Sequence, residues 1–206
     1  MKKVLFAAAA SLMFASSAHA VSVSLFETGV NLDGDQPTPS GVTSSLNSSG
    51  LGTLRVRVSG EGSHFVLGYF DYEIGEVFFD ETGGTSGTPG AGESWEVDEP
   101  GFVFGNILLN FQGGALDNTN GVDGLVDDVA MALGRSFDLA LGSRADVRFT
   151  SSLVRPRVPF YLWQTDEPTG RTIYLWSSVT AVPEPGSLAL LGLGLAALGL
   201  GRRQRR

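Results

Sequence analysis

Short runs in which apolar and polar residues alternate recur along most of the chain. In residues 53–59, Leu54, Val56 and Val58 alternate with arginine and polar residues, the period-two pattern of a strand buried on one side. Residues 21–26 alternate in the same way with serines. Further short runs occupy 64–72, 76–80, 94–97, 107–111, 146–151, 160–164 and 172–177. The pattern predicts a series of short strands.

Glycine-rich segments such as 31–41 and 81–92 separate these runs and are typical of loops. The short spacing between runs and the 28 glycines favour an all-β fold. We predict an antiparallel β-sandwich of about eight to eleven strands. One short helix is expected at 125–133, and no helical pattern recurs between strands, which argues against a parallel α/β sheet.

The first 20 residues depart from the strand pattern. Two lysines precede an apolar stretch, and Ala18 and Ala20 supply the small residues that signal peptidase requires beside the bond it cleaves. We therefore expect a signal peptide at 1–20, with a mature chain that begins at Val21. A short N-terminal core helix is the alternative interpretation.

The C-terminus carries a second departure. Pro183, Glu184 and Pro185 precede an apolar, glycine- and leucine-rich run at 186–201, and the chain ends in RRQRR. As a helix, this run would span about 24 Å, somewhat short of the roughly 20 residues that cross a bilayer comfortably. The terminal arginines predict a cytoplasmic end, which places the preceding residues on the outer side of the membrane.

This order of features resembles the PEP-CTERM sorting signal of exosortase substrates in Gram-negative bacteria. The resemblance implies that Pro183, Glu184 and Pro185 are recognised by exosortase, a membrane enzyme that cleaves near them. It implies export across the inner membrane, transient anchoring through the C-terminal helix, and release to the outer surface or matrix. Many members of the family are encoded alongside exopolysaccharide and biofilm genes. An ordinary tail anchor with a proline-rich stalk is the alternative.

The body resembles the same family more weakly. Segments 94–101 and 127–134 look like parts of uncharacterised PEP-CTERM surface proteins, a kinship that carries no known activity. We divide the chain into a signal peptide (1–20), an extracellular β-sandwich domain (21–181) and the sorting signal (182–206).

Charge and cysteine content remove several function classes. Residues 21–182 hold eight arginines, no lysine and 21 carboxylates, a net charge of −13. So acidic a body repels phosphate backbones, and we expect no nucleic-acid partner. The absence of cysteine removes disulfides, thiol nucleophiles and thiolate zinc sites.

A hairpin near the end of the body concentrates aromatic residues. Tyr161 and Trp163 share one face of the first predicted strand, and Tyr174 and Trp176 share one face of the second. If the two faces coincide, four aromatic rings form a stripe suited to stacking on sugars. Packing of these rings in the core is the alternative, because cross-strand aromatic pairs are stabilising there as well.

A second candidate site is an oxygen-rich loop. Asp117, Asn120, Asp123 and Asp127 lie within a short glycine-punctuated segment, and calcium takes six to eight such oxygen ligands. The spacing departs from the alternating pattern of known calcium loops, so solvated acidic turns are the alternative. Calcium is the single cofactor considered, and we otherwise expect none.

Catalytic candidates are weaker. Carboxylates cluster around Trp95, including Glu96 and Asp98, and a glycosidase needs two carboxylates beside a sugar. So acidic a chain produces such clusters by chance. His64 is the single histidine after Val21, and no nucleophile elbow, Walker loop or dinucleotide fingerprint is present.

The sequence thus predicts an exported, exosortase-processed cell-surface or biofilm-matrix protein with a non-catalytic body. Its expected partners are signal peptidase, exosortase, the membrane before processing, and exopolysaccharide. The alternatives are an extracellular glycan-active enzyme that uses clustered carboxylates, a calcium-stabilised glycan-binding module, and a simple structural spacer.

Overall fold

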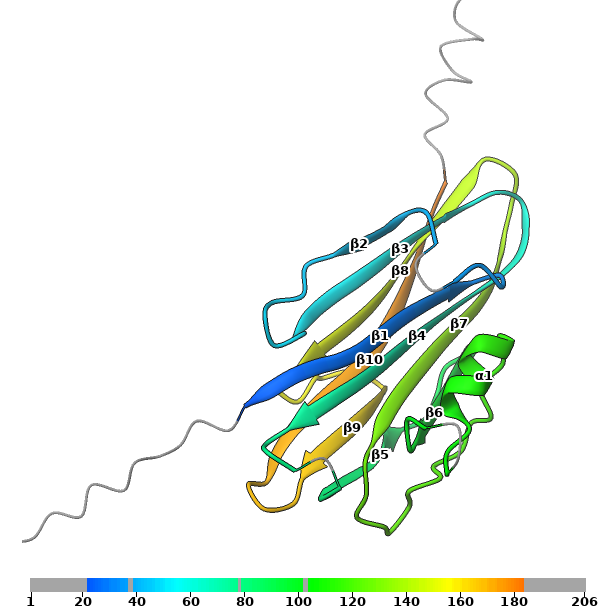
Figure 1. Ribbon diagram of the computed structural model, residues 1–206. Coiled ribbons are helices and arrows are strands. Elements are labelled where there is room, and N and C mark those ends of the chain that lie inside the picture. Colours follow the sequence, from blue (N-terminus) through cyan, green and yellow to red (C-terminus); the bar gives the residue numbers. More distant parts are fainter. Residues whose placement is uncertain (1–21, 37–38, 78, 102–103, 184–206) are drawn as a thin grey trace, which may run out of the picture.

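Two antiparallel sheets pack face to face in the computed structural model, which describes residues 22–36, 39–77, 79–101 and 104–183 (Figure 1). The four-stranded sheet has the order β1 (Val23–Leu32), β4 (Gly62–Ile74), β7 (Ala130–Leu139), β6 (Glu93–Asp98). The six-stranded sheet has the order β2 (Val42–Ser44), β3 (Gly52–Ser59), β8 (Ser143–Ser152), β10 (Arg171–Pro183), β9 (Phe160–Asp166), β5 (Glu81–Gly87). The predicted β-sandwich is confirmed.

The core lies between the inner faces of the two sheets. Leu54, Val56 and Val58 of β3 are buried, as the alternation in their strand predicts, and the intervening arginines point outward. Phe149 of β8 meets Phe70 of β4 across the interior, with ring centroids 6.3 Å apart. Burial of apolar side chains from both sheets in one cluster stabilises the sandwich.

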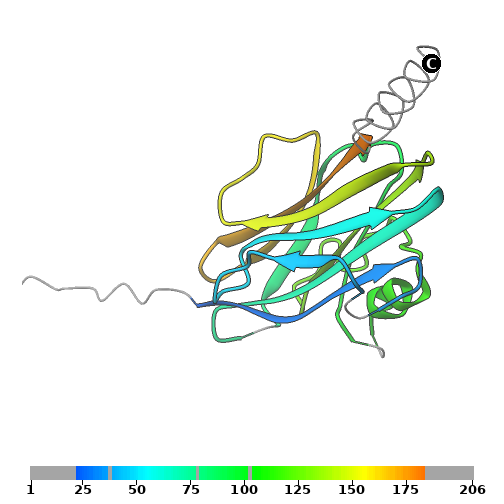
Figure 2. The same cartoon turned by 90° about the horizontal axis from the view of Figure 1, so that it is seen from above.

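Helix α1 (Ile107–Gly113) covers part of the outer face of the four-stranded sheet (Figure 2). The prediction of a strand at 107–111 is therefore wrong. Ile107, Leu108 and Phe111 have helical spacing, and they pack on Leu67 and Tyr69 of β4 in a second apolar cluster. Residues 107–111 are too few for the spacing of their apolar residues to distinguish a strand from a helix. The apolar surface of β4 therefore selected the helix.

Strand β5 forms where the sequence favours a loop, and the predicted strand at 76–80 is absent from the residues described there. The glycines of β5 are required because neighbouring side chains lie too close for a Cβ, and not because of a turn. A Cβ at Gly83 would stand 2.6 Å from Val97 Cγ1, and one at Gly84 would stand 2.6 Å from the Trp163 ring. The strand fits because both of its faces are filled by other strands.

The predicted helix at 125–133 is also absent, because β7 begins at Ala130. Small residues alternate with large ones along this strand. Ala130 and Ala132 belong to the cluster beneath α1, whereas Met131 and Leu133 face the core. Alanine fits both the two-residue period of a strand and the 3.6-residue period of a helix. The sequence of this segment therefore also matched a helical pattern.

The predicted signal peptide and the apolar run at 186–201 lie outside the described residues. Within the part of the chain that the structure describes, no helix is long and apolar enough to cross a membrane.

We predict that Gly83→Ala lowers the free energy of unfolding by about 1–3 kcal/mol, because the added methyl group overpacks the interior against Val97 and Val129. Gly113→Ala in α1 is the matched control, since nothing lies within 4 Å of its added Cβ. It should be neutral or stabilise by about 0.5–1 kcal/mol. Urea unfolding of the two variants measures the difference, and equal stabilities would contradict the packing of β5.

Candidate functional site

The four predicted aromatic residues lie on one face of the six-stranded sheet. The register pairs Tyr174 with Trp163 directly across β10 and β9. Leu162 and Leu175 are fully buried in the core, so alternation directs their neighbours outward. Tyr161, Trp163, Tyr174 and Trp176 therefore share the outer face, which we call the aromatic face. The aromatic faces of the two hairpin strands therefore coincide.

Trp163 is held against the edge strand β5. Its indole Nε1–H donates to the backbone carbonyl of Thr85, with 3.4 Å between nitrogen and oxygen. The ring lies over Gly84, where any side chain would collide with it. This support leaves Trp163 half-buried, with part of the ring open to solvent.

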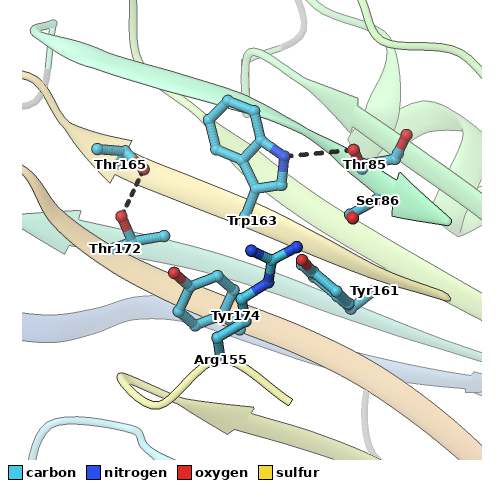
Figure 3. A pocket seen from close by; sticks show the side chains of 8 residues that line it. All are labelled: Thr85, Ser86, Arg155, Tyr161, Trp163, Thr165, Thr172 and Tyr174. Carbon is cyan, nitrogen blue, oxygen red and sulfur yellow. Dashed lines mark hydrogen bonds between the residues drawn. The ribbon is translucent and has the colours of Figure 1, made fainter. Parts of the chain in front are cut away.

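Arg155 reaches the aromatic face from the loop between β8 and β9 (Figure 3). Its guanidinium carbon lies 5.5 Å from the centre of the Tyr161 ring, within the range of a cation–π contact. Tyr161 meets Tyr174 edge to face, with centroids 5.7 Å apart. Tyr161 is only 5% exposed, so it supports its neighbours and leaves Trp163 and Tyr174 to offer the open ring surface.

Shallow hollows adjoin these rings. The one in Figure 3 has a volume of about 280 Å³ and includes the hydroxyls of Thr165 and Thr172, whose oxygens are 2.7 Å apart. A second hollow of about 500 Å³ shares Trp163 and Thr85 with the first. The arrangement combines flat aromatic surface, hydroxyl groups and open ends, which suits a long polar ligand better than a small enclosed one.

Three of the four predicted calcium residues are held by other contacts, and the fourth, Asp123, is exposed at the larger hollow. Asp117 accepts a hydrogen bond from Asn106, and the amide nitrogen of Asn120 donates to the carbonyl of Gly83. Asp127 caps the backbone N–H of Asp128. Among the described residues, no group of three or more histidine, aspartate and glutamate side chains is placed to hold a metal ion. The calcium prediction gains no support from this arrangement.

The carboxylates around Trp95 are structural. Trp95 and Val97 face the core, whereas Glu96 lies on the other side of β6, fully buried beneath the segment that follows it. Its carboxylate accepts hydrogen bonds from the Asn110 amide, at 2.9 Å, and the Asp117 backbone N–H, at 3.1 Å. Burial raises the pKa of Glu96. A sugar cannot reach this group.

His64 lies at the beginning of β4, away from the aromatic face. Its Nδ1 is 2.7 Å from one carboxylate oxygen of Asp33. The other carboxylate oxygen of Asp33 accepts a hydrogen bond from the Phe65 backbone N–H. The bond to Asp33 raises the pKa of His64. These contacts tie a turn to the sheet, which is a structural role.

An acidic hollow of about 430 Å³ lies on the outer side of the four-stranded sheet. Its carboxylates are those of Glu27, Asp71, Glu73 and Asp128. Asp71 is 3% exposed, and its Oδ1 has no hydrogen-bond partner among the described residues. Burial, with a smaller contribution from Asp128, raises the pKa of Asp71 to about 7. Burial likewise raises the pKa of Asp128 to about 6.

The beginning of the sorting motif is part of the sheet. Strand β10 continues to Pro183, which pairs with Ser143 of β8. Glu184 and Pro185 lie outside the described residues, as do the signal-cleavage residues Ala18 and Ala20.

The fold and this site define a β-sandwich whose six-stranded sheet presents an open aromatic face. Comparison with protein families adds the second step: residues 181–206 match the PEP-CTERM protein-sorting motif. That motif implies export, processing by exosortase and sorting to the cell surface. A search of the curated proteins and a search of the solved structures each return no match. The family match covers the C-terminal segment and assigns no activity to the body.

Sequence reasoning missed the contributions of Gly84, Thr85 and Arg155 to the site. In the sequence, the glycines of β5 look like loop glycines. Only the structure shows that the Trp163 ring occupies the space beside Gly84. Arg155 belongs to an irregular loop, where no periodicity indicates which way a side chain points.

We predict that the free energy of unfolding falls as the pH rises from about 4 to about 7. The folded chain keeps a proton on Asp71 that the unfolded chain releases near pH 4, so the contribution of Asp71 to stability is full below about pH 4 and is lost as the pH rises through about 7. Asp71→Asn should reduce the slope of this profile, leaving the part that comes from Asp128, and raise the melting temperature at pH 8 by about 5 °C.

Circular dichroism melts across this pH range test the prediction. Glu61→Gln, in the exposed turn between β3 and β4, is the control because it removes a carboxylate in contact with solvent. It should leave the profile unchanged. The same pH slope in Asp71→Asn and in the unaltered protein would show that Asp71 is ionised in the fold.

Proposed function

We propose that this protein is an exported cell-surface or biofilm-matrix component whose non-catalytic body binds exopolysaccharide on its aromatic face. The observation that carries the proposal is the pairing of half-buried Trp163 and Tyr174 on the outer side of the sheet, beside open hollows. In a core-packing role, both rings would be turned inward. They are turned away from the core instead.

The chemistry of the face supports a sugar ligand. The C–H-rich side of a pyranose ring is apolar and stacks on an aromatic ring, while its hydroxyl groups need hydrogen-bond partners. Trp163 and Tyr174 supply the stacking surface, and Thr165, Thr172 and Ser86 supply hydroxyls around it. An open hollow accommodates the interior of a polymer as well as its ends.

A glycan-active enzyme is the second candidate, favoured by one observation. Asp123 and Glu167 both line the larger hollow beside Trp163. A glycosidase needs one carboxylate to donate a proton and another to attack or to activate water. Both side chains are exposed, and Glu167 accepts a hydrogen bond from the Thr82 hydroxyl. This setting supplies no burial that would distinguish an acid from a base.

We predict that Trp163→Ala weakens binding of the protein to the exopolysaccharide of its own cells by about tenfold or more. Loss of an aromatic ring that stacks on a nucleic-acid base removes about 1–3 kcal/mol, and we expect a loss of the same order for a stacked sugar ring. Sedimentation of the purified full chain with the isolated polymer measures the effect. Phe26→Ala is the matched control, since Phe26 is 74% exposed and lies on the four-stranded sheet.

Equal binding by both variants would contradict a site at Trp163, and no binding by the unaltered protein would favour a structural spacer. The same samples test catalysis. Release of reducing sugar that disappears in Glu167→Gln would establish the enzyme instead of the binding module.

We predict that protein recovered from the outer surface or the medium begins at Val21 and has lost the arginine-rich terminus. Signal peptidase and exosortase together produce these ends. Intact mass spectrometry of separate inner-membrane, surface and medium fractions measures both ends at once. A species that retains Arg206 and remains in the inner membrane would contradict release and would point to a permanently anchored domain.

A further inference from the structure

The positive charges of the body gather on one side of the sandwich. Seven of its eight arginines belong to strands of the six-stranded sheet or to the loop between β8 and β9. They are Arg55 and Arg57 on β3, Arg144 and Arg148 on β8, Arg155 and Arg157 in the loop, and Arg171 on β10. A body with a net charge of −13 therefore places nearly all of its cations on one of its two sheets and the loop beside it.

The eighth arginine shows the contrast. Arg135 of β7 lies between the sheets, where its Nη2 is 2.6 Å from a carboxylate oxygen of Glu93 and its Nε donates to Ser177. Those two ion-paired side chains are 15% and 4% exposed. Arg135 is a structural charge. Five other arginines lie on the outer side of the six-stranded sheet: Arg55, Arg57, Arg144 and Arg148 alternate with buried residues, and Arg155 lies over the Tyr161 ring.

Strand alternation points the β8 arginines outward. Ala145, Val147 and Phe149 are fully buried, so Arg144 and Arg148 project from the opposite side of the strand. This is the side that carries the aromatic rings on β9 and β10, because all of these strands belong to one sheet.

Arg148 lies in an electrostatically unfavourable position when no ligand is bound. The register places it directly opposite Arg55 on β3, and like charges in directly opposed positions are destabilising. Arg55 is ion-paired with Asp146, which also bonds to Arg57. Among the described residues, no carboxylate lies within 4 Å of Arg148. An external anion would satisfy it.

The rings and the arginines form a continuous diagonal lane. Trp176 of β10 pairs with Thr150 of β8, and two residues further along β10, Ser178 pairs with Arg148. Arg148 in turn pairs with Arg55. Neighbouring strands lie about 4.8 Å apart, so the lane from β9 to β3 is about 14 Å wide. Several sugar units fit across such a distance.

From this geometry we propose that the ligand of the aromatic face is an acidic polysaccharide, one whose sugars carry carboxylates. The proposal rests on the proposed function and gives it a ligand class. Sugar rings stack on Trp163 and Tyr174, and the carboxylates of the polymer pair with Arg148 and with Arg155, whose guanidinium lies over the Tyr161 ring. A planar guanidinium matches a carboxylate through two parallel hydrogen bonds. A neutral polymer would use the rings and leave the arginines unpaired.

The test compares one polymer in two charge states. Polygalacturonate is a linear polymer of uronic acid, and full methyl esterification removes its charge while the sugar backbone stays the same. We expect the full chain, solubilised in a mild detergent, to bind the acid form at least about tenfold more tightly by calorimetry. This preference should diminish from about 0.01 M to about 1 M salt, because the Debye length falls from about 30 Å to about 3 Å.

Two variants separate charge from stacking. Arg148→Gln should weaken binding of the acid form about tenfold and leave the esterified form unchanged. Trp163→Ala should weaken binding of both forms. Gln112→Glu is the charge-matched control, because it lowers the net charge by the same amount on exposed surface of α1, above the other sheet. It should behave as the unaltered protein does.

Each result has a distinct meaning. Equal binding of the two forms would overturn the acidic ligand and leave the proposed glycan-binding function intact. Failure to bind either form, together with failure to bind the native exopolysaccharide, would overturn both proposals. Binding of single-stranded DNA as tight as that of polygalacturonate would show a surface for any polyanion, and the specific assignment would then fall.

Discussion

Close packing between the inner faces of the two sheets is the constraint on which the other features depend. Phe149 of β8 occupies the space above Gly68 of β4, where a Cβ would stand 2.9 Å from its ring. The same ring meets Phe70. Sheets this close favour apolar groups between them, and polar groups there need hydrogen-bond partners. The strands therefore turn most of their polar residues outward and keep the few inward ones, such as Arg135 and Glu93, in bonded pairs. The two outer faces carry the chemistry that a ligand can reach.

Those outer faces differ in a way that organises the molecule. The four-stranded sheet is partly covered by α1 and has a hollow lined with carboxylates. No described helix lies on the outer face of the six-stranded sheet, which presents aromatic rings, hydroxyls and guanidinium groups. A high net negative charge disfavours self-association in general. Local cations on one face restore attraction for a polymer of the opposite charge.

Strand β10 connects this face to the sorting signal. It contributes Tyr174 and Trp176 to the aromatic face, lies between β8 and β9, and continues to Pro183. The match to the sorting motif begins at residue 181, within this strand. The described body and the motif thus meet without an intervening linker, and a cut beyond the paired residues leaves the sheet whole.

The sequence alone determined the sandwich, the sorting signal and the pairing of aromatic residues on each strand, because period-two alternation and the terminal motif are local patterns. Only the tertiary structure decided that residues 107–111 form a helix, since Leu67 and Tyr69 on the outer face of β4 offer an apolar surface that the helix buries. Strand β5 likewise exists because Trp163 and Val97 fill the places of its missing side chains. Which face of the hairpin meets solvent, and which arginines stand beside it, depended on the pairing of strands distant in sequence, and no local pattern contains that information.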